Sequence, residues 1–134
     1  MSKFNQPNAN LMETISPYEK GNLVLNLAFD FALAIIEYTE LLEEKRKFNM
    51  ANQLFKSGTS IHANVREAQN AESKADFVHK IKVAAKEAEE TEGWLLLCQH
   101  ANSYPNSESL LLKLASILKL LNKIVGTTKR KLAD

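Results

Sequence analysis

The sequence predicts an all-α protein that folds as an antiparallel up-down four-helix bundle, and three observations favour this fold class. Apolar residues recur at alternating steps of three and four in four long segments, which is the spacing of one helix face. The 134 residues include only 4 glycines and 3 prolines, fewer chain breakers than a protein of strands and turns needs. The connections between the segments are short, which favours antiparallel packing of consecutive helices.

The first two helices are expected over about residues 22–47 and about residues 49–70. Asn22 is the expected N-cap of the first helix. The apolar spacing of the second helix runs without a shift through residues 57–60, so one continuous helix is predicted there although these residues are small or polar. The predicted core stripe of the first helix comprises Val24, Leu27, Phe31, Ala34, Tyr38 and Leu41.

The third and fourth helices are separated by a turn at residues 104–107. Ser73 and Asp76 stand in the spacing of a capping box, which predicts the start of the third helix. The fourth helix is expected from about Glu108 to at least Val125, with Gly126 either capping it or lying inside a longer helix. Residues 1–20 are polar and aperiodic, so they are expected to form an arm outside a bundle domain of residues 21–134.

The composition narrows the class of protein. A net charge of +1 argues against a surface that is basic throughout, although a local basic patch remains compatible with it. The single cysteine, Cys98, excludes an internal disulfide and favours a reducing compartment. The most apolar run, residues 23–36, is shorter than the roughly 20 residues that span a bilayer. We therefore expect a cytoplasmic protein without a membrane partner.

Catalytic and metal chemistry find little support in the residues. A di-iron bundle needs two Glu-x-x-His units and two further carboxylates, whereas the nearest match is a single Asp76 and His79 pair. The sequence has no glycine-rich phosphate loop and no nucleophile in a recognisable context. We therefore expect no catalytic residues, no metal site, no cofactor and no enzymatic activity.

The first helix carries apolar residues on more than one side. Leu25, Phe29 and Ile36 lie nearly opposite the predicted core stripe, and the apolar arc is wider than a surface helix needs. One interpretation is that the helix packs against two neighbours and that the N-terminal arm covers the remainder. The other, which we favour, is a homo-oligomer that buries these three side chains between subunits.

Polar residues line one flank of each of the two central helices. If these helices are neighbours, the two flanks are expected to meet in a hydrogen-bonded inter-helix motif. The alternative is a face in contact with solvent, and a catalytic role of Glu87 and Glu90 is disfavoured because no nucleophile accompanies them. The motif comprises Ser57, Asn64, Glu67, Lys80, Glu87, Glu90 and Trp94.

The C-terminal fifth is distinctly basic. Solvated lysines explain most such runs, but a patch repeated in an oligomer can bind phosphates at several points. The candidate nucleic-acid contacts are Lys123, Lys129, Arg130 and Lys131.

Two strings in the centre of the chain carry a family resemblance, one over residues 53–61 and one over residues 63–69. The positions that follow them, from Ser73 to Leu95, fit as well. Together they resemble the bacterial four-helix-bundle proteins encoded in intervening sequences of 23S rRNA genes, sometimes labelled a ribosomal protein family. Two residues depart from the pattern: His62 stands where a glycine is expected, and Gly93 where an aromatic residue is expected beside Trp94.

The resemblance implies an up-down bundle that assembles into a ring-like homopentamer, and it supplies no catalytic residues. A distant relative, the accessory variability determinant protein, is a pentamer that binds nucleic acid and a reverse transcriptase. The leading hypothesis is therefore an oligomeric scaffold, without enzymatic activity, that engages RNA or an RNA-bound protein. The alternative is a protein–protein interaction module with no nucleic-acid role.

Overall fold

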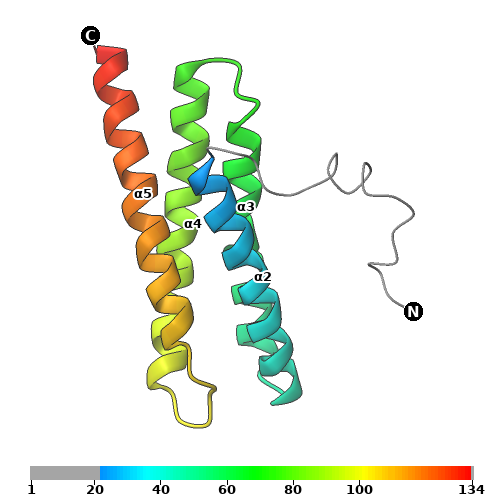
Figure 1. The fold of residues 1–134 in the computed structure, drawn as a ribbon. Helices are drawn as coiled ribbons and strands as arrows, with labels where there is room; N and C mark the ends of the chain where they lie inside the picture. The colour runs from blue at the N-terminus through cyan, green and yellow to red at the C-terminus, as the bar shows by residue number, and fades with distance from the viewer. Residues whose placement is uncertain (1–21, 134) are drawn as a thin grey trace, which may run out of the picture.

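Four α-helices make up the described part of the chain in the computed structural model (Figure 1). The structure describes the backbone of residues 22–133 and the side chains of residues 22–130. The expected N-terminal arm and the side chain of Lys131 lie outside this description. The helices are α2 (Leu23–Glu44), α3 (Phe48–Ala68), α4 (Lys74–His100) and α5 (Glu108–Ala133).

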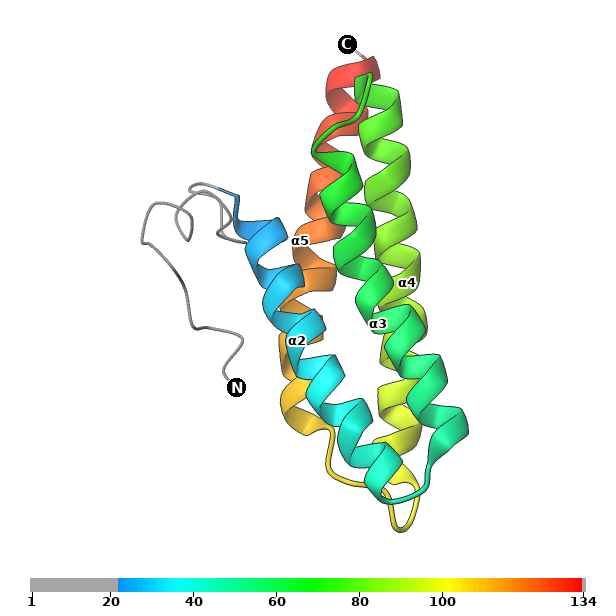
Figure 2. The same cartoon turned by 90° about the vertical axis from the view of Figure 1, so that its right-hand side faces the viewer.

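The helices form the predicted antiparallel up-down bundle. Each helix packs against the next one along the chain, and α5 returns to lie beside α2 (Figures 1 and 2). The α2–α3 connection and the α4–α5 connection lie at one end of the bundle, while the α3–α4 connection and the end of α5 lie at the other. Within the described residues, no helix combines the length and the apolar character that crossing a membrane requires.

The helix ends follow local side-chain chemistry. The side chain of Asn22 accepts a hydrogen bond from the backbone N–H of Leu25 at 3.2 Å, which confirms it as the N-cap of α2. Ser73 caps α4 in the same way, by accepting from the backbone N–H of Asp76 at 3.0 Å. α5 continues past Gly126 to Ala133, so that glycine does not end the helix. α3 is continuous through residues 57–60, as predicted.

The core lies between all four helices, but α2 faces it differently from the prediction. Val24, Phe31 and Tyr38 of the predicted stripe are buried, whereas Leu41 is 38% exposed. Leu27 and Ala34 are only partly buried. The buried residues of α2 are instead Val24, Leu25, Ala28, Phe31, Ala32, Ile35, Tyr38, Thr39 and Leu42.

The side of α2 that faces the core is set by a close approach between α2 and α3. A Cβ atom added to Gly58 would lie only 2.8 Å from Cγ1 of Ile35, so the glycine lets the Ile35 side chain rest against the α3 backbone. Ile35 is 0% exposed. Because α2 turns this side toward α3, its opposite flank, toward α5, stays partly open.

Candidate functional site

The predicted inter-helix motif is not joined into a network. The side-chain amide of Asn64 donates to the backbone oxygen of Ser60 at 2.8 Å, within its own helix. Lys80 pairs with Asp76 at 3.0 Å, one turn away on α4. Glu67 and Glu90 are exposed, and no described residue pairs with them. The prediction of a shared network is therefore wrong, because these long side chains stay with their own helix or with solvent.

A shorter polar contact joins α3 and α4 instead. The hydroxyl oxygens of Ser57 and Thr91 lie 2.9 Å apart in a hydrogen bond, and both residues are 0% exposed. The Thr91 hydroxyl also lies 2.7 Å from the backbone oxygen of Glu87. The motif thus contributes Ser57 to the interface. Its partner, Thr91, was not among the predicted motif residues, and its polar side chain was the only signal in the sequence that pointed to it.

The remaining motif residues sit at the edge of the α3–α4 interface. Burial raises the pKa of Glu87, and the neighbouring charge of Glu90 raises it further. The indole Nε1 of Trp94 is buried and has no hydrogen-bond partner among the described residues. These groups do not form a constellation of nucleophile, base and orienting group.

Of the three residues predicted on an oligomer face, Leu25 belongs to the core of the subunit and Phe29 contacts α3. Leu25 is 1% exposed and belongs to the core, so it cannot bury further surface between subunits. Phe29 packs edge-on against His62 of α3, with ring centroids 5.5 Å apart and planes at 67°. Ile36 is half-buried. The predicted oligomer face is therefore wrong for Leu25 and stays a prediction for Phe29 and Ile36.

The two departures from the family pattern are both accommodated. His62 lies one turn from the close approach at Gly58, and its bulk is taken up by the contact with Phe29. Burial, and then the charge of Arg66, lowers the pKa of His62. α4 runs unbroken through Gly93, where an added Cβ would meet nothing within 4 Å. Within the described residues, no three His, Cys, Asp or Glu side chains are placed to hold a metal ion.

A buried tyrosine fastens the α4–α5 connection to α2. The hydroxyl of Tyr38 donates to the backbone oxygen of Pro105 at 2.6 Å. Burial, assisted by the neighbouring Cys98, raises the pKa of Tyr38 well above its ordinary value. Burial also raises the pKa of the Cys98 thiol. Both groups are therefore held in their neutral forms.

Stability is expected to fall in alkaline solution because of this tyrosine. An unperturbed tyrosine has a pKa of about 10, so the unfolded chain loses the proton at a lower pH than the folded chain does. Above about pH 10 the unfolded state binds fewer protons, and the free energy of unfolding decreases as the pH rises. Urea titrations at neutral and alkaline pH measure this decline. Tyr38→Phe should make it shallower, and an unchanged slope in that variant would contradict the prediction.

A basic cluster lies where the first half of α4 meets the end of α5. The neighbouring Lys129 lowers the pKa of Lys82, because its amine and its positive charge disfavour a second ammonium group beside it. Arg130 is exposed beside it, with its guanidinium 3.3 Å from the Thr127 hydroxyl. Among the described residues, no carboxylate pairs with these groups within 4 Å. The structure thus adds Lys82 to the predicted contacts, whereas Lys123 is exposed further back along α5.

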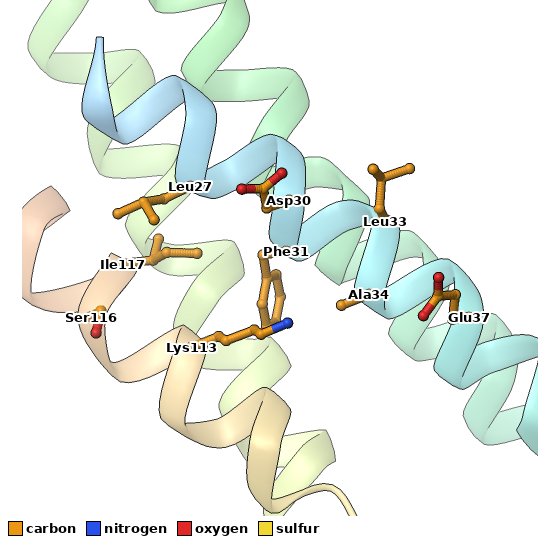
Figure 3. Close-up of a pocket in the computed structure, with 9 residues that line it drawn as sticks. All are labelled: Leu27, Asp30, Phe31, Leu33, Ala34, Glu37, Lys113, Ser116 and Ile117. Carbon is orange, nitrogen blue, oxygen red and sulfur yellow. The ribbon is translucent and has the colours of Figure 1, made fainter. Parts of the chain in front are cut away.

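A groove runs along the open flank between α2 and α5 (Figure 3). Its volume is about 440 Å³, and Leu27 and Phe31 of α2 face Ile117 of α5 across it. The side chain of Lys113 extends from α5 toward Phe31. Glu37 lies on the α2 side, where a second cleft of about 290 Å³ continues the groove toward the α4–α5 connection.

Comparisons with known proteins agree with the geometry. The family model described as 23S rRNA-intervening sequence protein matches residues 20–123. The chain is also similar to the crystal structure of a protein with unknown function from the S23 ribosomal protein family of Bacteroides thetaiotaomicron VPI-5482. The two are 40% identical, the similarity covers 76% of this chain and 97% of that chain, and the TM-score is 0.72. No functionally curated protein matches the chain.

Proposed function

This chain belongs to the 23S rRNA-intervening sequence protein family, and we propose that it acts as a cytoplasmic homo-oligomeric scaffold that associates with RNA. The scaffold carries out no catalysis, and its partner is RNA itself or an RNA-bound protein. The single observation that carries the proposal is the set of exposed cations Lys82, Lys129 and Arg130, which no carboxylate among the described residues neutralises.

A phosphate placed between two ammonium groups stabilises both of them, because its negative charge offsets their mutual repulsion. Neutralising phosphates with lysine and arginine releases counterions and supplies most of the sequence-independent affinity for nucleic acid. The cluster consists of the cations Lys82, Lys129 and Arg130 and offers no aromatic ring on which a base could stack. The proposed contact is therefore with the backbone or shape of the RNA.

Oligomerisation is expected to raise the affinity for RNA that a cluster of only three cations provides. Each subunit repeats the same three cations, and several weak contacts on one assembly raise the overall affinity without any new contact. The family resemblance supports a pentameric ring, in which the cluster would occur once per subunit.

We expect Lys129→Ala/Arg130→Ala to weaken binding to a transcribed 23S rRNA hairpin. The slope of the logarithm of the binding constant against the logarithm of the salt concentration should decrease by about 1 to 2, because two phosphate contacts are lost. Fluorescence anisotropy at several potassium chloride concentrations measures this slope. Lys82→Ala should produce a smaller change in the same direction.

The matched control is Lys45→Ala/Arg46→Ala. It also removes two exposed cations, but from the α2–α3 connection at the other end of the bundle (Figure 1). Absence of binding by the wild-type protein at low salt would overturn the RNA proposal. So would an equal loss in both double variants, because the cluster would then have no special role.

A second candidate function is protein recruitment without nucleic acid. Leu96 and Leu97 of α4 are 46% and 57% exposed, and Leu97 lines a small cleft beside Gly93 and Trp94. Such a surface suits an apolar side chain of a protein partner. A partner that stays bound after nuclease treatment and in high salt, and that is lost with Leu97→Ser, would favour this function over RNA association.

A further inference from the structure

The groove between α2 and α5 leaves apolar side chains of the four helices uncovered. Leu27, Phe31 and Ile117 line its floor, and Ala34 lines both the groove and the adjoining cleft (Figure 3). Leu27 and Ala34 are only partly buried. Leu41, in the adjoining cleft, is 38% exposed. Contiguous apolar surface of this kind is typical of a place where another segment binds.

The charges that border the groove have both signs. Asp30 and Glu37 extend from α2, whereas Lys113 extends from α5 toward Phe31. Lys113 and Glu37 line the adjoining cleft as well. Because the two signs largely offset one another, the groove favours an occupant that is mainly uncharged. An acidic group of that occupant would pair with Lys113, since no described carboxylate lies within 4 Å of this amine.

A segment of the N-terminal arm has this character. Residues 11–18 contain one charged residue, Glu13. Four of these eight residues are apolar or aromatic, namely Leu11, Met12, Ile15 and Tyr18. The segment lies outside residues 20–123, which the family model matches, so its pairing with the groove is a property of this chain and not of the matched region.

The length of the chain allows this segment to reach the groove of its own subunit. Asn22 caps α2, and Ala34 follows twelve residues later, which is about 18 Å along the helix axis. Ile15 precedes Asn22 by seven residues, and seven extended residues span about 23 Å. The chain before α2 is therefore long enough to turn back and place Ile15 beside Ala34.

We propose that residues 11–18 occupy the groove between α2 and α5 of the same subunit. Ile15 then covers Ala34 and the apolar floor. Glu13, two residues farther from α2, pairs with Lys113. The segment supplies the apolar cover that the four helices leave out. The inference does not rest on the proposed function, because the basic cluster of α4 and α5 takes no part in it.

Disulfide trapping in the full-length, nuclease-treated protein tests this assignment. In the variant Ile15→Cys/Ala34→Cys, oxidised glutathione should join the two new thiols within one chain, because the proposed contact brings them together. Non-reducing electrophoresis distinguishes bonds within a chain from bonds between chains, and mass spectrometry of the digested protein identifies the linked peptides. The native Cys98 is buried and stays in place.

The matched control is Ile15→Cys/Ala63→Cys, with the second thiol on an exposed position of α3, a helix that does not contact α5. The side chains of Asn22 and Gln69 are joined by a hydrogen bond of 2.7 Å. Ala63 precedes Gln69 by six residues, about 9 Å along α3. The control position is thus nearer to the start of α2 than Ala34 is. Trapping at Ala34 should still be at least about tenfold faster, because docking raises the local concentration of one thiol beside the other.

A charge reversal tests the pairing of Glu13 with Lys113. Lys113→Glu should slow trapping at Ala34 by about threefold, the effect of a partly exposed ion pair, and adding Glu13→Lys should restore the rate. Lys119→Glu, on the same helix but outside the groove, should leave the rate unchanged. A rate that does not respond to Lys113→Glu would overturn the ion pair.

Two results would overturn the docking itself. The first is trapping that is equally fast, or equally absent, at Ala34 and Ala63, because the segment would then have no preference for the groove. The second is a disulfide between two chains, because the segment would then occupy the groove of another copy. Neither result bears on RNA binding by the basic cluster, so the two proposals fail separately.

Discussion

Leu25→Ala is expected to lower the free energy of unfolding by about 2 to 5 kcal/mol, the range for truncating a large apolar side chain in a packed core. The leucine is 1% exposed and lies between α2 and the rest of the bundle. Removing it leaves a cavity that the neighbouring helices fill only in part. Urea denaturation under conditions that keep the protein monomeric measures the effect on the subunit alone.

The control for this prediction is Leu33→Ala on the same helix. Leu33 is 46% exposed, so its truncation should change the free energy of unfolding of the monomer by no more than about 0.5 kcal/mol. Leu25 was expected on the outer side of α2, so this pair of variants tests which side of the helix is buried. Equal effects of the two substitutions would contradict the orientation of α2.

Gly58→Val is expected to destabilise the protein by about 3 kcal/mol, the upper end of the cost of overpacking a core. The new Cβ would lie 2.8 Å from Cγ1 and 2.9 Å from Cγ2 of Ile35. These atoms are the branches of a fully buried side chain, so they cannot swing into solvent. α2 and α3 must separate, and the thermal midpoint should fall in a scanning fluorescence or calorimetric measurement.

Two further variants separate packing from helix propensity. Gly93→Ala on α4 meets nothing within 4 Å and should stabilise the protein by up to about 1 kcal/mol. Ile35→Ala combined with Gly58→Val should cost less than the sum of the two single changes, by about 1 to 2 kcal/mol, because the truncated side chain makes room. Additive effects would argue against the contact between Ile35 and Gly58.

The starts of α2 and α4 were predictable because they depend on neighbours in the sequence, whereas α2 ends at Glu44, before the expected end at about residue 47. Asn22 and Ser73 cap helices with side chains that reach only three residues along the chain. The continuity of α3 through residues 57–60 follows from apolar spacing alone. The family membership was also predictable, since its motif occupies two consecutive helices.

The candidate site was predictable only in part. The basic character of the end of α5 is visible in the sequence, and Lys129 and Arg130 are exposed there. Lys82 was missed because it precedes Lys129 by 47 positions and reaches it only through the packing of α4 against α5. The prediction of a polar network was wrong for a related reason. A helical pattern predicts which side of a helix a residue lies on, but not whether its side chain contacts the neighbouring helix.

The sequence by itself determined the number, the order and the approximate starts of the helices, because periodicity and capping act within a few residues. Only the tertiary structure decided which side of α2 is buried. That choice depends on one close approach, of Ile35 to Gly58, which turns Leu25 inward and leaves Leu33 and Leu41 beside the groove. On a helix with apolar residues around most of its circumference, hydrophobicity alone does not distinguish these orientations. Steric fit between two helices does.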